Sequence, residues 1–360
     1  INSTQSPQQY ECEVLIVGGG LVGLTMCVAL ADAGVSTIVV DRDTHDVTTA
    51  PAFDGRASAI AAGSRDVLAT LGVWDGIVED GAPAAQPILE IRVSDGASPL
   101  YLHYDFREID QGPLGYIVEN RFTRIALHGR IAALSDAIML QGRNMKALQR
   151  GPDRAQATLD DGTIISADLV IAATPARTTA ALLGPHLGGA GAGLAQAPTL
   201  SSVTVELAFE RAQVDHPLDG TGFVVATDQQ RDGLRAGTFS STKFVGRSPP
   251  GQVSLRLFFR PSPEDVQRLD DDAWTQRALA GVQRILPVSG RPLRTWVSRW
   301  PDALPVFTDG YEDVVAAAEA ALAPHAIVLA GSAFHGAGID AAVRSGDAAA
   351  AAAKVRGLTA

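Results

Sequence analysis

The most constraining stretch of this sequence is an apolar run, a group of glycines, and a second apolar run that ends in an acid. It reads EVLIVGGGLVGLTMCVALADAGVSTIVVDRD and covers residues 13–43. Its hydrophobic pattern changes from strand to helix and back to strand. The expected elements are a strand at 13–17, a turn at 18–23, a helix at 24–33 that ends at Gly34, and a strand at 36–40. This order is a βαβ unit.

The glycines have the G-x-G-x-x-G spacing of dinucleotide-binding turns, in the strand-to-helix context that such a turn requires. Gly18 would permit the tight turn, Gly20 would leave room for a pyrophosphate against the backbone, and Gly23 would let helix and strand pack closely. The free N–H groups at the start of the helix would face the phosphates. Asp41 ends the second strand, where its carboxylate could bind an adenosine ribose. The motif alone does not distinguish NAD from FAD. The alternative to a cofactor site is a glycine-rich turn that binds no ligand.

The rest of the chain indicates a second lobe, because 360 residues exceed what one compact core usually holds. Alternating and β-branched runs between Gly- and Pro-rich loops predict further strands. The elements expected after the βαβ unit are helices at 65–71, 120–134 and 271–285, and strands at 88–95, 99–106, 169–173, 202–209, 222–226 and 253–259. Residues 326–355 read as strand, glycine loop and helix, with the alanine run 348–353 in the helix.

Charge and composition limit the classes of binding partner that we expect. The chain has 29 Lys and Arg against 40 Asp and Glu, a net charge of −11, which disfavours a nucleic-acid partner. Its seven histidines show no metal-ligand spacing, so we predict no metal. Cys12 and Cys27 form no CxxC pair and read as small buried hydrophobes. The oligomeric state stays unknown.

The expected location is the cytoplasm. The N-terminus shows no secretory signal, and the sequence holds no apolar run of about 18 residues. These features favour a soluble protein of a reducing compartment, with peripheral contact to the inner membrane left open. Residues 1–10, INSTQSPQQY, are polar and lack an apolar period, so we expect a disordered leader.

Two parts of the sequence resemble two groups of flavoproteins. Within about 13–145, VLIVGGGLVGLTMCVALADAGVSTIVVDRD, FDGRASAIAAGSRDVLATLGVWD, ILEIRVSDGASPLYLHYD and YIVENRFTRIAL resemble FAD-dependent ubiquinone-biosynthesis hydroxylases, which are aromatic-ring monooxygenases. From about 168 onward, ADLVIAATPARTTAALL, TGFVV, AGTFSSTKF, VSRWPDALPVFTDGY and LAGSAFHGAGIDAAVRSGDAAAAA resemble protoporphyrinogen oxidase and its amine-oxidase-type relatives. Both groups bind FAD, so the overlap favours FAD over NAD.

The resemblance implies an α/β fold with two lobes. One is a glutathione-reductase-type FAD-binding Rossmann lobe with a parallel sheet and a small β-meander, and the other is an α+β substrate lobe with an antiparallel sheet. We expect a discontinuous FAD-binding domain at 11–82, 114–182 and 320–360, and a substrate domain at 83–113 and 183–319.

The resemblance also implies residues that hold the cofactor. Gly18, Gly20 and Gly23 would hold the pyrophosphate, and Asp41 the ribose. The other implied contacts are Arg42, Arg56 and Arg124 at the outer edge of the flavin and the phosphates, the Met145 backbone at the adenine, and Gly331, Ser332, Gly338 and Ile339 at the ribityl chain and isoalloxazine.

Three residues are candidates for catalysis or substrate binding. His335 lies in the last glycine loop, where its imidazole could touch the flavin, and solvation is the alternative. Lys243 and Arg299 lie in the second lobe, where a cation could clamp a substrate carboxylate, and a surface salt bridge is the alternative.

The two resemblances imply different reactions. The hydroxylases carry an Asp-Gly motif for flavin and NAD(P)H after the strand that here reads LVIAA, and this chain has ATPARTT there. We therefore expect an FAD-dependent oxidase of a bulky hydrophobic ring substrate, with protoporphyrinogen as the implied candidate and molecular oxygen as electron acceptor. The alternatives are an NAD(P)H-dependent monooxygenase that hydroxylates a polyprenyl phenol, and a flavin-binding protein without turnover.

Overall fold

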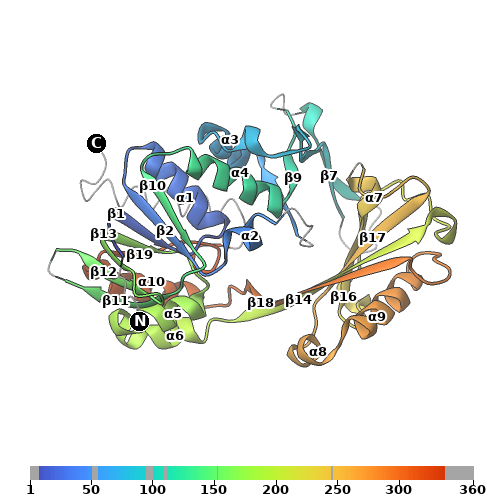
Figure 1. The fold of residues 1–360 in the computed structure, drawn as a ribbon. Helices are drawn as coiled ribbons and strands as arrows, with labels where there is room; N and C mark the ends of the chain where they lie inside the picture. Colours follow the sequence, from blue (N-terminus) through green and yellow to red (C-terminus); the bar gives the residue numbers. More distant parts are fainter. Residues whose placement is uncertain are drawn as a thin grey trace, which may run out of the picture. The chain divides into compact units, whose positions relative to one another are not determined.

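The computed structural model divides the chain into two compact units. The first comprises residues 1–93, 102–198 and 307–360, and the second comprises 94–101 and 199–306. The structure describes residues 8–50, 56–94, 100–108, 112–151, 153–244 and 246–336 (Figure 1). The boundaries fall after Pro198 and before Phe307, so helices at 176–187 and 311–322 join the first unit. The assignment of FAD to one unit and substrate to the other stays a prediction.

The first unit is built on a seven-stranded sheet in the order β10-β2-β1-β13-β12-β11, with β19 also paired to β13. The strands β10, β2, β1, β13 and β19 run parallel, and β11 and β12 add an antiparallel meander. Their bounds are β1 Gln9–Val17, β2 Thr37–Asp41, β10 Ala137–Gln141, β11 Met145–Arg150, β12 Ala155–Leu159, β13 Ile164–Ala172 and β19 Ile327–Leu329.

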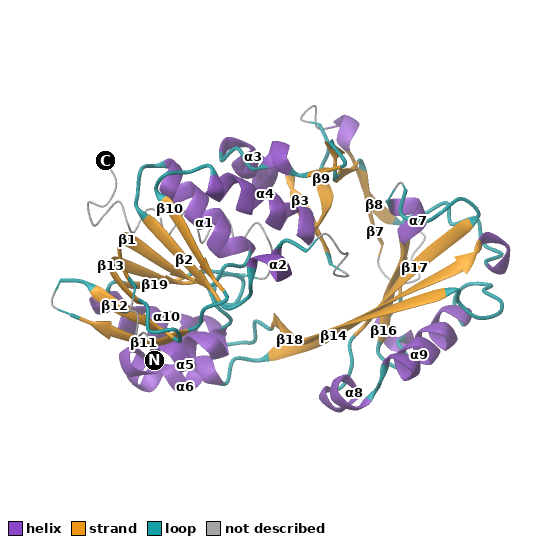
Figure 2. Ribbon diagram, viewed as in Figure 1, coloured by secondary structure: helices purple, strands orange, loops and turns teal. Residues whose placement is uncertain are grey.

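Helices cover both faces of this sheet, as Figure 2 shows. In α1 and α4, apolar side chains pack with Val14 and Ile16 of β1, whereas those of α5, α6 and α10 pack with Leu15 and Val17 from the opposite face. Because both faces are buried, the strands are continuous apolar runs. The helices are α1 Leu21–Asp32, α4 Asn120–Ala132, α5 Ala176–Leu187, α6 Gly191–Ala195 and α10 Tyr311–Leu322.

Smaller elements complete the first unit. A three-stranded sheet has the order β3-β9-β6, and two pairs are β4-β5 and β7-β8; the last residue of β7, Ser94, and the first of β8, Tyr101, belong to the second unit. Their bounds are α2 His45–Thr48, β3 Ala57–Ala61, α3 Ala62–Thr70, β4 Val78–Glu79, β5 Ala82–Pro83, β6 Ala85–Ile88, β7 Glu90–Ser94, β8 Tyr101–Asp105 and β9 Gly115–Glu119.

The second unit is a five-stranded antiparallel sheet in the order β15-β16-β17-β14-β18. Alternate apolar side chains of β14 and β17 pack on one face against α9, around the fully buried Trp274. The bounds are β14 Thr199–Glu210, β15 Gly222–Val224, β16 Leu234–Phe239, α7 Ser240–Lys243, β17 Gln252–Phe259, α8 Pro263–Arg268, α9 Asp271–Gln283 and β18 Arg294–Pro305.

The predicted fold class is confirmed, and three local predictions need correction. The expected leader at 1–10 is wrong for its last residues, because Gln9 and Tyr10 begin β1 and pair with β13; residues 1–7 lie outside the described residues. The turn at 18–23 is shorter than expected, since α1 begins at Leu21. The strand β18, which includes Arg299, lies where no strand is predicted from the sequence.

Both cysteines are buried free thiols, as predicted. Burial raises the pKa of the Cys12 thiol and of the Cys27 thiol to about 12.

Candidate functional site

The turn between β1 and α1 requires glycine at its first and last motif positions. Gly18 has φ +113°, a conformation that side chains rarely adopt, and its N–H donates to the Val40 carbonyl at 2.9 Å. A Cβ at Gly18 would lie 2.7 Å from the Ala173 carbonyl oxygen, and one at Gly23 would lie 1.9 Å from the Gly18 carbonyl oxygen. These two glycines therefore let β1, β13 and α1 approach one another.

Gly20 differs, because a Cβ there would meet no protein atom within 4 Å. Gly20 is the N-cap of α1 and has no side chain to cap the helix. The first N–H groups of a helix have no intrahelical acceptors, and α1 starts at the mouth of the turn. Open space and free N–H groups at the same point fit the pyrophosphate of a dinucleotide.

The Asp41 carboxylate lies beside this turn. It accepts hydrogen bonds from the N–H of Gly19 and, at 2.7 Å, from the N–H of Asp43. The Asp41 carbonyl accepts from the Arg143 N–H at 3.0 Å, which joins β2 to the end of β10. Asp41 is half-buried at the end of β2.

Gly19 is a residue that the motif reading missed. A Cβ there would lie 2.8 Å from the Asp41 carboxylate, so this position also needs glycine. The run of three consecutive glycines at 18–20 was the available signal, since the motif itself needs no glycine at the middle position.

The closing segment returns to the same turn. Gly331 follows β19 with φ +113°, and a Cβ there would lie 3.8 Å from Val22 in the first turn of α1. Ser332 next to it is half-buried. The structure therefore brings Gly331 to the α1 N-terminus, while Gly338 and Ile339 lie outside the described residues.

The remaining predicted cofactor residues lie at several places around the first unit. Arg42 is exposed, with its Nε 3.7 Å from the Asp43 carboxylate. Arg56 and Arg124 are half-buried, and the Arg56 carbonyl accepts from the Asn120 N–H at 3.2 Å at the start of α4. Met145 is buried at the start of β11. Their contacts with a cofactor stay predictions.

A buried histidine lies on α4 near Arg124. His128 is 8% exposed, and its ring centroid is 5.4 Å from that of His45 on α2. Burial, followed by the charges of His45 and Arg124, lowers the pKa of His128 to about 4. This imidazole is therefore neutral near pH 7.

Two of the candidate catalytic residues contact carboxylates. His335 is exposed, and its Nε2 lies 3.0 Å from the Glu319 carboxylate on α10. Arg299 on β18 donates to the Asp271 carboxylate at 2.6 Å and to the Leu269 carbonyl at 2.9 Å. Neither contact tests the roles predicted for them.

Lys243, the third candidate, has a different environment in the second unit. It is half-buried at the end of α7, and its Nζ lies 5.9 Å from the centre of the Phe244 ring. Burial, followed by the charge of Arg256, lowers the pKa of Lys243. Arg256 itself pairs with Glu206, Nε to Oε2, at 2.8 Å.

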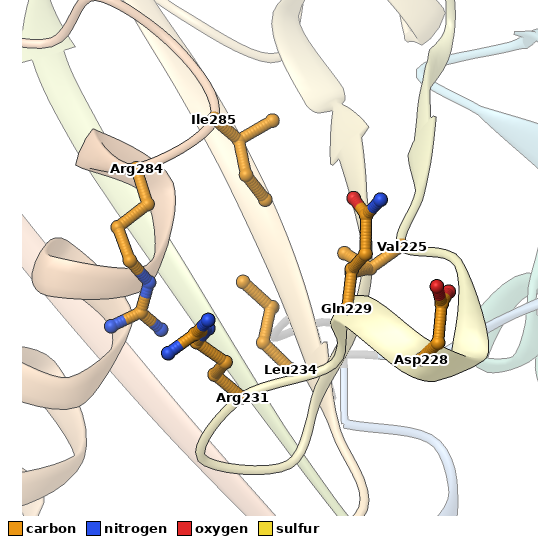
Figure 3. Close-up of a pocket in the computed structure, with 7 residues that line it drawn as sticks. All are labelled: Val225, Asp228, Gln229, Arg231, Leu234, Arg284 and Ile285. Atoms are coloured by element: carbon orange, nitrogen blue, oxygen red, sulfur yellow. The ribbon is translucent and has the colours of Figure 1, made fainter.

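A pocket of about 410 Å³ lies elsewhere in the second unit, between the loop after β15 and the end of α9. Its lining residues are Val225, Asp228, Gln229, Arg231, Leu234, Arg284 and Ile285. Figure 3 shows the two arginine side chains at one end of the view and Asp228 at the other. None of the cofactor-binding or catalytic residues predicted from the sequence lines this pocket.

One group of side chains on the β7-β8 pair has metal-ligand character. The ligand atoms of Glu90, His103 and Asp105 lie within 4.8 Å of one another. Arg107 already binds Asp105, donating from Nε at 2.9 Å, and holds the pKa of that carboxyl at about 2. The prediction of no metal stays a prediction.

Among the described helices, none combines the length and the apolar character that crossing a membrane would require.

Two family models match this chain. The model described as FAD binding domain matches residues 11–226, and the model described as flavin containing amine oxidoreductase matches residues 126–354. Each covers more than half of the chain, and they overlap in the middle. The predicted flavoprotein resemblance and the predicted FAD are confirmed.

Relatives from both groups of flavoproteins that the sequence resembles match this chain. The chain is 47% identical to ubiquinone hydroxylase UbiL of Rhodospirillum rubrum over 46% of this chain and 38% of the relative. It is 30% identical to coproporphyrinogen III oxidase of Propionibacterium freudenreichii over 64% of this chain and 41% of the relative. The chain thus spans less than half the length of these relatives.

A solved structure shares the fold. A protein described as a protoporphyrinogen oxidase from Exiguobacterium sp. 255-15 superposes with a TM-score of 0.66 at 16% identity, covering 98% of this chain and 100% of that one.

Proposed function

This chain belongs to the FAD binding domain and flavin containing amine oxidoreductase families, and from this premise we propose that it oxidises a porphyrinogen with oxygen as electron acceptor. The chain is an FAD-dependent oxidoreductase of a small-molecule substrate. The proposal adds the class of reaction and a bulky, hydrophobic ring as the substrate.

The residues around the first turn fit FAD. Gly20 leaves the space that a pyrophosphate needs, the α1 N-terminus supplies N–H donors, and Asp41 offers a carboxylate edge to a ribose. When bound, FAD supplies a two-electron acceptor. The role of the chain is to hold the dinucleotide against α1 and to bind the substrate.

The observation that carries the choice of an oxidase is the segment after β13. Ala173 donates to the Val17 carbonyl at 2.8 Å, so this segment runs beside the dinucleotide turn. It continues as Thr174 and Pro175, and the Thr174 hydroxyl lies 2.7 Å from the Thr179 hydroxyl. A hydroxylase would be expected to carry an acid and a glycine here. The 30% identity to a coproporphyrinogen III oxidase also supports the proposal.

A second candidate is an NAD(P)H-dependent monooxygenase that hydroxylates a polyprenyl phenol. It is favoured by the 47% identity to a ubiquinone hydroxylase, which exceeds the identity to the oxidase. The match covers 46% of this chain and 38% of the relative.

Anaerobic reduction of the FAD-loaded chain separates these functions. We expect coproporphyrinogen III to bleach the visible flavin absorbance and air to restore it with release of hydrogen peroxide. NADH or NADPH should leave the absorbance unchanged. Bleaching by a nicotinamide, but not by the porphyrinogen, would instead establish the monooxygenase. A yellow protein that no donor reduces would be a flavin-binding protein without turnover.

A further inference from the structure

One face of the sheet in the second unit carries buried charges. Glu206 on β14 and Arg256 on β17 lie opposite each other in register, and their side chains are 11% and 3% exposed. Alternate residues of a strand point to opposite faces, so this pair lies on the face away from the Trp274 core. The 2.8 Å ion pair neutralises both charges.

Lys243 adds a second cation to this face. The helix α7 packs against β16 and β17, and the charge of Arg256 contributes to lowering the pKa of Lys243. Within the described ranges, no carboxylate oxygen lies within 4.0 Å of the Lys243 Nζ. The Lys243 Nζ lies 5.9 Å from the centre of the Phe244 ring. Lys243 therefore carries a positive charge in a partly desolvated place.

Two serine hydroxyls accompany this ammonium on α7. The Oγ atoms of Ser240 and Ser241 are buried and have no hydrogen-bond partner, and Ser240 is 0% exposed. Residues three apart on a helix are neighbours, so Ser240 and Lys243 share one side of α7. Buried polar groups are normally hydrogen-bonded, and those without a partner call for an explanation. One ammonium and two hydroxyls together suit a ligand that only accepts hydrogen bonds.

The arginine pocket of Figure 3 is the competing anion site. Its cations are exposed: Arg284 pairs with Asp232 at 3.1 Å, and the Arg231 side chain faces solvent. Exposed cations are hydrated and need no counter-ion, whereas a desolvated cation is stabilised by an anion. The charge argument therefore favours α7.

We propose that Lys243, with Ser240 and Ser241, binds a carboxylate group of the ring substrate. The ammonium would donate to one carboxylate oxygen and the hydroxyls to the other, while Glu206 keeps Arg256 neutralised. This proposal rests on the proposed function, because a porphyrinogen bears carboxylates and a polyprenyl phenol does not. All of these residues lie in the second unit.

The test is equilibrium binding of coproporphyrin III, the fluorescent and already oxidised ring, to the FAD-loaded chain. Its tetramethyl ester, which lacks the charges, is the comparison ligand. Lys243→Met should weaken coproporphyrin binding about tenfold or more and leave ester binding within about twofold. Lys243→Arg should restore most of the affinity.

The matched control is Arg231→Met, which removes one positive charge from the same unit. It should bind coproporphyrin within about twofold of the parent chain. Thermal unfolding and FAD content check that each variant is folded, and Ser240→Ala provides a second variant with no change in charge, expected to weaken binding several-fold.

Three results would overturn the proposal: no coproporphyrin binding by the parent chain, equal binding by the parent and Lys243→Met, or a loss confined to Arg231→Met. The last would assign the carboxylate to the arginine pocket. Because the probe is not turned over, its binding is independent of the reduction experiment. Lys243-dependent binding without flavin bleaching would reject the oxidase alone, and bleaching without Lys243 dependence would reject this site alone.

Discussion

A Cβ atom at Gly23 would lie 1.9 Å from the carbonyl oxygen of Gly18, so the first turn of α1 can pack on β1 only without a side chain there. At Gly20, three residues earlier, a Cβ would meet no protein atom within 4 Å. One motif thus contains a glycine that the fold needs and a glycine that the protein itself does not need. This difference separates folding from cofactor binding.

We expect Gly23→Ala to destabilise the FAD-free chain by about 1–3 kcal/mol, because α1 must shift away from β1. The free energy of unfolding of Gly20→Ala should lie within about 0.5 kcal/mol of that of the parent chain, since the added methyl group enters open space. The same change should weaken FAD binding about tenfold or more if the pyrophosphate approaches there. Denaturant unfolding and FAD titration measure the two effects. Unchanged FAD affinity in Gly20→Ala would contradict the predicted place of the pyrophosphate.

Asp41 should contribute to both the turn and the cofactor. Its carboxylate accepts from the N–H groups of Gly19 and Asp43, and Asn would turn an amide N–H toward one of these donors. We expect Asp41→Asn to cost about 1–3 kcal/mol of unfolding free energy and to weaken FAD binding about tenfold. Asp43→Asn is the control, because Asp43 is 51% exposed and should change stability by less than about 0.5 kcal/mol. Equal effects of the two variants would argue against a special role for Asp41.

The βαβ unit could be predicted because its signals are local. An apolar run, a glycine turn and a second apolar run lie within 31 residues, and the structure forms them as β1, α1 and β2. The start of α1 was misplaced by three residues because glycine is a poor helix former. Close packing on β1 nevertheless makes Leu21 the first helical residue.

The strand β18 was missed for a physical reason. Its stretch holds Pro301 and Pro305, which predict loop. β18 lies at the edge of its sheet, where a proline need not donate to a neighbouring strand. An edge position depends on the order of strands that are far apart in sequence, so local pattern could not supply it.

Long-range side-chain pairs were beyond the sequence pattern for the same reason. Nothing local indicates that Glu206 meets Arg256, 50 residues away, or that Lys243 adds its charge nearby. Lys243 was selected only as a cation in the second lobe. Its distinguishing environment follows from the packing of α7 on β17 and from the charge of Arg256, which the sequence pattern does not indicate.

Replacing one member of the Glu206–Arg256 pair should lower the free energy of unfolding far more than replacing both. Glu206→Met removes the carboxylate that Arg256 binds and leaves the buried Arg256 under the influence of the Lys243 charge, so we expect a loss of about 3–5 kcal/mol of unfolding free energy. Arg256→Met leaves Glu206 near Lys243, which can partly replace the lost cation, so its loss should be smaller. The double variant should be closer to the parent than Glu206→Met alone. A double-mutant cycle by denaturant unfolding measures this, and additive losses would rule out the coupling.

His128 should make stability fall as the solution becomes acidic. Its pKa is lowered from 6.5 to about 4 in the folded chain by burial, His45 and Arg124. Between these two values the unfolded chain binds more protons than the folded chain, so stability rises with pH there. The contribution is fully present above pH 6.5 and is lost as pH falls toward 4. His128→Gln, which does not titrate, should therefore lose less stability than the parent between these two pH values, by on the order of 1 kcal/mol or more. Unfolding free energies at pH 8, 6 and 4.5 measure the difference, and the pH 8 values isolate the packing change because His128 is neutral in both states. Parallel pH profiles of parent and variant would show that this imidazole does not cause the acid sensitivity.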